Sequence, residues 1–377
     1  MKVLIVGGAT QDLFVSYQGA DLMRITKQGV AAEYAIFESG EKCEVDTLFT
    51  QTGGGATNSA TSFRYQGFDV DCFCMAGSDT IGDSIIASIA GYGINTSLIQ
   101  RTKDHPSGQS IIINSASGER TIFAFRGANN HLPIETLTRE HLIGIDHIYI
   151  TSLSNNSSLK LPIFAQMAHE QGVPIAINPG KSQLTKGVQT LKTSLSSIDT
   201  LILNSNEAQL CMHALIESDA TYKEALESAT SEHLSGINLH SKEPYLLASS
   251  IAWQDQHFSM RKFFQAVLAM GPSIVVVTNG QNGVYVATSE QILFHPSLSI
   301  NAVNSVGAGD AFGSTFIASL ATGNSKEDAL RLGIINSASV LQKVGAKTGL
   351  LERDQLLHAL KGLDKTLLQS FPMKNGL

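Results

Sequence analysis

The feature that most constrains the fold is a regular alternation of short apolar runs and helical patterns, which begins after Gly53. The predicted strands are 69–76, 147–151, 174–178, 200–204, 273–278, 283–287 and 292–294, and a further apolar strand, 2–8, precedes them. The predicted helices are 58–65, 82–90, 159–171, 307–322, 326–344 and 352–361. Such alternation is typical of a doubly wound α/β protein, an αβα sandwich with a mostly parallel central sheet.

Three segments depart from this alternation. Residues 13–50 hold short β-rich pieces between polar turns, and 109–114 with 121–125 predict a hairpin that turns at Gly118. We expect these pieces to form a small β-sheet lid from about 13–50 and 107–126. Residues 211–270 lie between two expected strands and predict a helical insertion. The whole chain, 1–377, is interpreted as a single domain.

Composition excludes several classes of function. The net charge of −7 disfavours nucleic acid as a partner, because nucleic-acid binding needs a basic surface. No apolar run is long enough to span a membrane, and the apolar N-terminus is too short for a signal peptide. The four cysteines lack zinc-site spacing, and Cys72 and Cys74 are expected to be packed, reduced thiols on one strand face. We therefore expect a cytoplasmic protein.

Residues 301–312, NAVNSVGAGDAF, carry the clearest chemical signal. Gly307, Ala308 and Gly309 are small residues at the start of a predicted helix, where free N–H groups and the helix dipole bind anions. Asp310 follows in the first turn, where a carboxylate can take a proton from a hydroxyl beside a transferring phosphoryl group. The alternative is that Asp310 only caps the helix, but a cap does not need three small residues before it.

A second cluster, 53–60, reads GGGATNSA. Glycines before a helix let a ligand approach the backbone, and Asn58 offers both donors and acceptors to hydroxyl groups. Taken alone, this pattern is equally consistent with a flexible loop that leads into a helix.

These clusters stand among motifs whose order and spacing resemble the ribokinase-like (PfkB) carbohydrate kinases. The matching segments are 53–60 with Gly67, Gly77, Asp79 and Gly82; Asn204 to Glu207 (NSNE); Thr278 to Gly283 (TNGQNG); 304–310 (NSVGAGD); and 336–346. The resemblance spans about residues 3 to 350. It implies the same fold that the alternation predicts, an ATP-dependent kinase activity, and ATP and Mg²⁺ as cofactors.

The resemblance also implies a role for individual residues. Asp310 would be the catalytic base, and Gly307, Ala308 and Gly309 would form the anion hole. Substrate hydroxyls would be held by Asp12, Gly54, Gly55 and Asn58. The nucleotide would be bound by Asn204, Thr278, Gly280, Gly283 and Asn336, with Glu207 placing Mg²⁺ through water.

Two positions depart from the family pattern. The family most often has Asp-Thr where this chain has Asn304 and Ser305. In relatives activated by a monovalent cation that Asp contributes to the cation site, so both outcomes stay open here: K⁺ bound at Asn304, or no K⁺ activation. Thr315 stands where the family usually has Gly or Ala, which we expect to alter only helix packing.

The acceptor is less defined than the reaction. Gly127 to Asn129 (GAN) and the neutral segment 151–156 favour a neutral sugar, and a nucleoside that carries the same ribose hydroxyls is the alternative. A non-catalytic ligand-binding relative is a second alternative. A dinucleotide-binding oxidoreductase is excluded, because the first strand ends without a G-x-G-x-x-G motif. The family resemblance also implies a homodimer that pairs through the lid.

Overall fold

The computed structural model describes residues 1–17, 19, 21–27, 30–114, 120–226, 243–249, 251–253 and 256–373. Its centre is a nine-stranded sheet. In spatial order, the first six strands run parallel and the last three join antiparallel. The strand order is β6 (Asp69–Phe73), β1 (Lys2–Val6), β11 (His147–Ile150), β12 (Ile175–Ile177), β13 (Thr200–Asn204), β16 (Ile274–Thr278), β17 (Val284–Ala287), β18 (Gln291–His295) and β19 (Gln369–Pro372).

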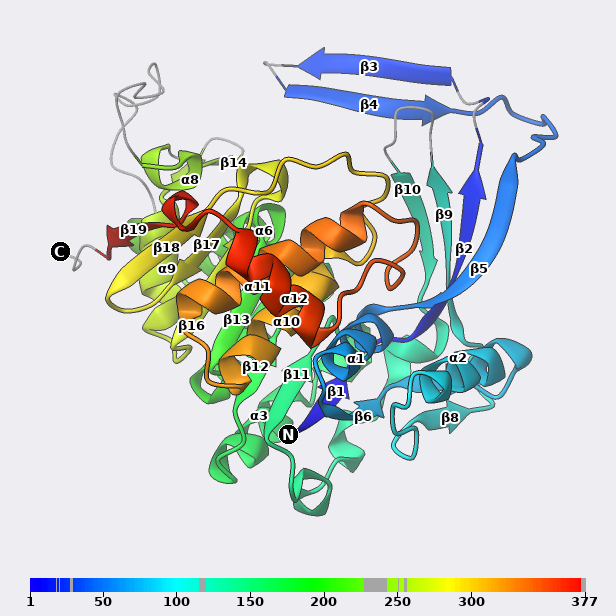
Figure 1. Cartoon of the computed structure of the whole chain (residues 1–377), viewed down its shortest axis with the longest axis horizontal. Coiled ribbons are helices and arrows are strands. Elements are labelled where there is room, and N and C mark those ends of the chain that lie inside the picture. Colours follow the sequence, from blue (N-terminus) through cyan, green and yellow to red (C-terminus); the bar gives the residue numbers. More distant parts are fainter. Residues whose placement is uncertain are drawn as a thin grey trace.

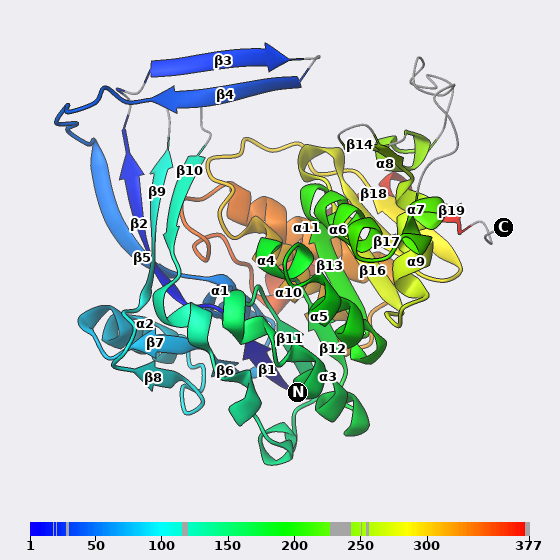
Figure 2. The same cartoon turned by 180° about the vertical axis from the view of Figure 1, so that it is seen from behind.

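Helices cover both faces of this sheet. One face carries α1 (Gly55–Tyr65), α10 (Ala308–Ala321), α11 (Lys326–Leu341) and α12 (Arg353–Gly362), which lie in front in Figure 1. The other carries α3 (Leu161–Glu170), α4 (Lys181–Leu184), α5 (Val188–Ser194), α6 (Ser205–Ser218), α7 (Thr221–Leu226), α8 (Tyr245–Ala248) and α9 (Met260–Leu268), which lie in front in Figure 2. The αβα sandwich predicted from the sequence is therefore confirmed.

The two faces explain why the strands are apolar throughout. In β1, Leu4 and Val6 belong to the core under α3, α5, α6 and α9, whereas Val3 and Ile5 belong to the core under α1 and α10. Successive side chains of a strand point to opposite faces, so a strand buried on both faces shows no polar alternation.

A second, four-stranded sheet stands at one end of the body, to the right in Figure 1. Its order is β10 (Arg120–Phe125), β9 (Gly108–Asn114), β2 (Thr10–Ser16) and β5 (Thr47–Gly53). The hairpin of β3 (Asp21–Lys27) and β4 (Val30–Ile36) crosses its outer end. This small four-stranded sheet contains only part of the segments from which the sequence predicted a small β-sheet, since β3 and β4 pair with each other as a separate two-stranded sheet. The predicted hairpin turn at Gly118 lies outside the described residues.

Smaller differences from the expected elements have local causes. The predicted strand 69–76 splits into β6 and β7 (Met75–Gly77), because β7 leaves the main sheet to pair with β8 (Gln100–Thr102) beside α2 (Thr80–Gly91). Within the predicted insertion, 227–242 lies outside the described residues. The described part holds helices and also a hairpin of β14 (Ile251–Trp253) and β15 (Gln256–Phe258).

Two compositional expectations also have structural outcomes. Cys72 and Cys74 are buried free thiols whose Sγ atoms lie 3.9 Å apart. Within the part of the chain that the structure describes, no helix combines the length and apolar character that crossing a lipid bilayer requires.

Thr315 links α10 to α11 inside the core. Its Oγ1 accepts a hydrogen bond of 2.7 Å from Nδ2 of Asn336, and Oδ1 of Asn336 accepts one of 2.9 Å from the N–H of Leu351. Thr315 and Asn336 are both almost completely buried. The hydroxyl at position 315 therefore has a structural role, since without it the Asn336 amide would be left with an unsatisfied donor.

Thr315→Val should lower the free energy of unfolding by about 1–3 kcal/mol, because it keeps the side-chain volume and removes the acceptor. Thr61→Val is the matched control: Thr61 is equally buried, but its hydroxyl donates only to the carbonyl of Thr57, one turn earlier in α1. Urea unfolding of both variants measures the difference. Equal stability of the two variants would contradict this role for Thr315.

Candidate active site

The candidate site lies where α10 begins, at the carboxyl ends of the parallel strands. Asp310 is the third residue of α10, and its Oδ2 accepts a hydrogen bond of 2.8 Å from Nδ2 of Asn58 on α1. The two residues are 252 positions apart in the chain. The structure thus joins the two clusters on which the sequence analysis depended, the glycine-rich segment and the NSVGAGD segment.

Asp310 has an unusual electrostatic environment. Burial raises the pKa of its carboxyl to about 6, although the hydrogen bond from Asn58 and the charge of Lys347 lower it, while Asp12 raises it. Asp310 as a residue is half-buried. A carboxyl with a pKa close to neutrality is well suited to accept a proton at physiological pH.

The residues before Asp310 form an open helix terminus. Gly307 caps α10 in the left-handed conformation with φ 80°, and a Cβ there would lie 2.6 Å from Cα of Ala346. Only glycine fits this turn. The N–H groups of Ala308, Gly309 and Asp310 belong to the first turn of the helix and have no acceptor within it. They form a cradle suited to a phosphate group.

Asp12 lies within β2, at the base of the small sheet. It is buried, and Oδ1 accepts a hydrogen bond of 2.7 Å from Oγ1 of Thr10. Burial raises the pKa of Asp12, and hydrogen bonds from Thr10 and Ser110 lower it. A Cβ at Gly53 would lie 1.8 Å from Oδ2 of Asp12, so this glycine leaves room for the carboxylate.

The other glycines of this segment are required by close packing. Gly54 has φ 90°, and a Cβ there would lie 2.5 Å from the carbonyl oxygen of Gly8. A Cβ at Gly55 would lie 2.8 Å from Cβ of Thr151. These contacts press the start of α1 against the ends of β1 and β11. Roles for Gly54 and Gly55 in substrate binding stay predictions.

A cavity of about 370 Å³ lies on the other side of the α10 terminus. It is lined by Asn204, Thr278, Gly280, Val284, Ser297, Leu298, Ile300, Ser305, Ala308, Gly309, Phe312, Ile334, Ser337, Ala338 and Leu341. Asn204 and Thr278 are register partners at the ends of β13 and β16, although their motifs are far apart in the sequence. The lining pairs an apolar slot with polar groups at the α10 end, as an adenine nucleotide requires.

Two residues predicted to contact the nucleotide do not line this cavity. Gly283 packs against β18, where a Cβ would lie 2.4 Å from the carbonyl oxygen of His295. The side chain of Asn336 is used inside the core, as described above. The α11 residues that reach the cavity are instead Ile334, Ser337, Ala338 and Leu341.

Asn204 and Glu207 form a capping box at the start of α6. The Asn204 N–H donates to Oε2 of Glu207 at 2.8 Å, and the Glu207 N–H donates to Oδ1 of Asn204 at 2.9 Å. Burial raises the pKa of Glu207, the backbone of Asn204 lowers it, and the charge of Asp310 raises it. These two mutually repelling carboxylates fit a nearby divalent cation held by nucleotide phosphates and water. Among the described residues, no three or more His, Cys, Asp or Glu residues cluster as a metal site of their own.

Asn304 lies just before the anion cradle and orders the backbone there. Its Oδ1 accepts a hydrogen bond of 3.0 Å from the N–H of Val306. Its buried Nδ2 has no hydrogen-bond partner among the residues that the structure describes. A monovalent cation at Asn304 stays a prediction.

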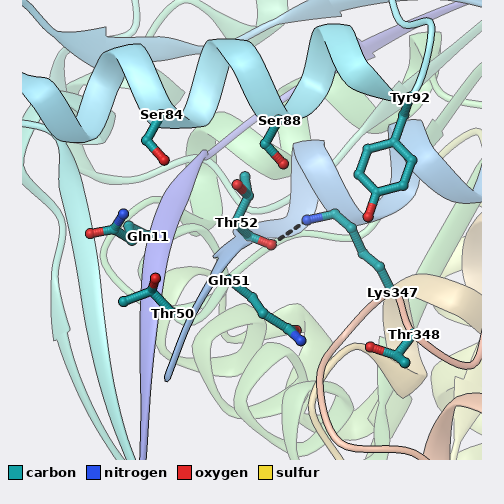
Figure 3. Close-up of a pocket in the computed structure, with 9 residues that line it drawn as sticks. All are labelled: Gln11, Thr50, Gln51, Thr52, Ser84, Ser88, Tyr92, Lys347 and Thr348. Atoms are coloured by element: carbon teal, nitrogen blue, oxygen red, sulfur yellow. Dashed lines mark hydrogen bonds between the residues drawn. The ribbon is translucent and has the colours of Figure 1, made fainter. Parts of the chain in front are cut away.

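Lys347 is the site residue that sequence reasoning missed. Its Nζ donates hydrogen bonds to the carbonyl of Thr52 and, at 3.0 Å, to Oγ1 of Thr57. Figure 3 shows this side chain reaching β5 across a polar cavity of about 320 Å³ between the small sheet and α2. Burial lowers the pKa of Lys347 to about 8, although the charges of Asp12 and Asp310 raise it. The sequence predicted a turn at Gly345 and Ala346. It did not indicate that the side chain of Lys347 points into the protein.

Comparisons with known proteins identify the family that the chain matches. The profile described as pfkB family carbohydrate kinase matches residues 26–237 and 249–353. A ribokinase of Staphylococcus aureus is 25% identical over 356 residues, which cover 93% of this chain and 96% of the relative.

Solved structures share the fold. The Arabidopsis thaliana ribokinase complexed with ribose and ATP superposes with a TM-score of 0.70 at 18% identity and covers 95% of this chain and 98% of its own. The Burkholderia thailandensis nucleoside kinase in complex with inosine gives a TM-score of 0.69 at 15% identity, with coverage of 96% and 98%.

Asp310→Asn should stabilise the folded protein at neutral pH by about 2 kcal/mol. The folded pKa of Asp310, about 6, lies above the unfolded value. Stability from this group is therefore fully present below about pH 4 and is lost as the pH rises through 6. Denaturant unfolding should be measured from pH 4 to 8. The free energy of unfolding of the variant, relative to that of the wild type, should increase as the pH rises from about 4 through 6 and then stay constant. Asp69→Asn, on an exposed carboxylate, should follow the wild type at every pH. If Asp310→Asn raised the free energy of unfolding by the same amount at pH 4 and pH 8, the result would contradict the burial of a charged Asp310.

Proposed function

Because this chain belongs to the pfkB family of carbohydrate kinases and is an ATP-dependent sugar kinase, we propose that it phosphorylates a hydroxyl group of a small neutral sugar, with Asp310 as the catalytic base. The observation that carries the proposal is the hydrogen bond between Asn58 and Asp310 at the open terminus of α10. This contact supports the proposal because it brings a carboxylate, an amide and the open N-terminus of a helix together.

Asn58 supports the acceptor side of this proposal. Its Nδ2 donates to Asp310, whereas its buried Oδ1 has no hydrogen-bond partner in the described part of the chain. A buried acceptor without a donor is costly, and a sugar hydroxyl would satisfy it. Asp12 is a second buried acceptor, and its charge raises the pKa of Asp310. Together they select a ligand with several hydroxyl groups.

The same arrangement supports the chemistry of phosphoryl transfer. The acceptor hydroxyl gives its proton to Asp310, its oxygen forms a bond to the γ-phosphorus, and the bond from that phosphorus to the bridging oxygen breaks, which releases ADP. The N–H groups of Gly309 and its neighbours would bind the transferring phosphate oxygens. Mg²⁺, held by the nucleotide and by Glu207 through water, would neutralise phosphate charge when bound. Positioning and electrostatics therefore carry the reaction.

The relatives include enzymes whose names specify ribose and nucleosides, and both ligands present ribose hydroxyls. Asp12 and Asn58 would bind hydroxyl groups of either ligand. Gly127 to Asn129 and the neutral segment 151–156 favour a free neutral sugar as the acceptor, and a nucleoside is the competing acceptor that the assay must include.

Wild-type protein should release ADP from Mg-ATP with one acceptor class in a panel of sugars, phosphosugars and nucleosides. Asp310→Asn should lower kcat by about 10²–10⁴-fold, because the base is lost while the fold and the nucleotide cavity stay intact. Calorimetry should show ATP affinity close to that of the wild type. Wild-type turnover in Asp310→Asn would contradict the proposed base, and turnover on nucleosides alone would contradict the proposed acceptor.

We further propose that the small sheet is a lid over the acceptor and that two copies pair through its outer face. The register places Ile111, Phe123, Leu13 and Leu48 on the face opposite to Asp12. Phe123 and Leu48 are 56% and 60% exposed, and Ile111 is 43% exposed. Exposed apolar side chains that gather on one face of a sheet are typical of an association surface.

Phe123→Glu should convert a wild-type dimer into a monomer, because it would bury a charge at the centre of the interface. Light scattering after size-exclusion chromatography gives the mass of each species. Ile163→Glu, on the exposed surface of α3, is the matched control and should remain dimeric. A monomeric wild type, or a dimer that survives Phe123→Glu, would contradict this interface.

A further inference from the structure

Ala9 lies at the point where the chain leaves the main sheet for the small sheet. It follows β1 and precedes β2, belongs to neither strand, and is completely buried. The side chain of Asn129 pairs with its backbone: the Ala9 N–H donates to Oδ1 at 2.9 Å, and Nδ2 donates to the Ala9 carbonyl at 2.8 Å. One amide therefore binds both backbone groups of the residue that links the two sheets, in the manner of a strand partner.

Asn129 is itself fixed to the body of the protein. It lies in the short helix η1 (Gly127–His131) and is 6% exposed. Ser157 lies in the short helix η4 (Asn155–Ser158), which follows β11, and its Oγ donates a hydrogen bond of 2.9 Å to the Asn129 carbonyl. The segment after β11 thus anchors η1, and η1 holds the link between the sheets.

The amide of Asn129 is closely enclosed by two glycines. A Cβ at Gly108, the first residue of β9, would lie 2.2 Å from Nδ2 of Asn129, and a Cβ at Gly8 would lie 3.4 Å from Oδ1. Gly108 therefore leaves the space that the amide occupies. A side chain packed in this way has little freedom to give up its two hydrogen bonds.

The other side of the same backbone faces the glycine-rich segment at the start of α1. The N–H of Ala56 donates a hydrogen bond of 3.0 Å to the Gly8 carbonyl. A Cβ at Gly54 would lie 2.8 Å from Cα of Ala9. Gly8 and Ala9 are therefore held between η1 on one side and the start of α1 on the other.

This arrangement connects the two groups that are proposed to bind the acceptor. Asp12 follows Ala9 closely along β2, and Asn58 follows Ala56 closely along α1. The contact of Gly8 and Ala9 with the start of α1 therefore determines where the two side chains lie relative to each other. A shift of Ala9 along or away from α1 would move Asp12 relative to Asn58.

We propose that Asn129 is a positioning residue for the acceptor: by holding the backbone of Ala9, its amide sets the position of Asp12 relative to Asn58. Both hydrogen-bonding atoms of the amide are used by Ala9, so Asn129 acts through Asp12 and not by touching the acceptor. The inference rests on the proposed role of Asp12 in acceptor binding.

Two variants at position 129 test this role with the acceptor that the panel identifies. Asn129→Asp keeps the size of the side chain and an oxygen for the Ala9 N–H, but it places a second oxygen against the Ala9 carbonyl. Asn129→Ala removes both contacts. In each variant the KM for the acceptor should rise about 10–100-fold, the loss expected for one hydrogen bond to a charged group. The KM for ATP and kcat should stay close to those of the wild type.

Asn324→Ala is the matched control. Nδ2 of Asn324 also donates to a backbone carbonyl, that of Ser319 at 3.1 Å, but it lies beyond the opposite end of α10 from Asp310. This variant should lose stability without any change in the KM for the acceptor. An unchanged acceptor KM in folded Asn129→Asp and Asn129→Ala would overturn the proposal.

A double-mutant cycle tests whether Asn129 acts through Asp12. Asp12→Asn should raise the KM for the acceptor by itself, and adding Asn129→Asp to it should raise that KM no further. If the two changes instead multiply, Asn129 supports the fold in general and the proposal is wrong.

Hydrogen exchange provides a measurement that needs no acceptor. The Ala9 N–H should lose protection in Asn129→Ala, and unchanged protection would overturn the proposal. If neither variant at position 129 folds, Ser157→Ala takes their place, because it removes the hydroxyl that anchors the Asn129 carbonyl. Its KM for the acceptor should rise about threefold, and an unchanged KM would again overturn the proposal.

Asp12→Asn alone separates this inference from the proposed function. If it leaves the KM for the acceptor unchanged, the proposed role of Asp12 fails, and the inference fails with it. If it raises that KM while the variants at position 129 do not, the proposed function stands and only the inference fails.

Discussion

The close contact between α1 and α10 is the interaction on which the site depends. The buried face of α1 is built mainly from small residues, Ala56 to Ser62, and the facing turns of α10 are equally small. Oγ of Ser314 donates a hydrogen bond of 2.7 Å to Oγ of Ser62 one turn after Asp310. A Cβ at Gly313 would lie 2.3 Å from Oη of Tyr149, so α10 also lies tightly on the sheet. This packing is what brings Asn58 within hydrogen-bond distance of Asp310.

That packing also determines the electrostatics. Helices that approach closely exclude water from the groups between them, and burial is the largest cause of the raised pKa of Asp310 and the lowered pKa of Lys347. The burial that destabilises these charges in the folded state would give Asp310 the basicity that its proposed role in proton transfer requires. If Asp310 is the base, stability and activity are opposed at this point of the structure.

Much of the fold could be predicted from the sequence, because strands buried on both faces leave a continuous apolar signature. The strand at 200–204 was predicted to the residue, whereas α5 and β19 were missed since their side chains are mixed in polarity. At the site, motifs predicted Asp310, Asn58 and the anion cradle. Lys347 could not be predicted, because a lysine in a turn is normally exposed and its burial follows from packing against distant β5. The role of Asn336 beside the nucleotide stays a prediction; its amide is hydrogen-bonded within the core, which its motif position did not indicate.

Under the proposed assignment, the two substrates occupy separate parts of the structure. The cavity proposed for the nucleotide is built from the ends of β13 and β16 with α10 and α11, whereas Asp12 and Asn58, which are proposed to bind the acceptor, come from β2 and α1 at the base of the small sheet. The two parts meet at the first turn of α10, where Ala308 and Gly309 line the cavity and Asp310 accepts a hydrogen bond from Asn58. On this assignment, changes in the small sheet would alter acceptor binding without disturbing the nucleotide. The residues of the α10 turn serve both halves, and there even the addition of one methyl group, as at Gly307, meets the backbone of Ala346.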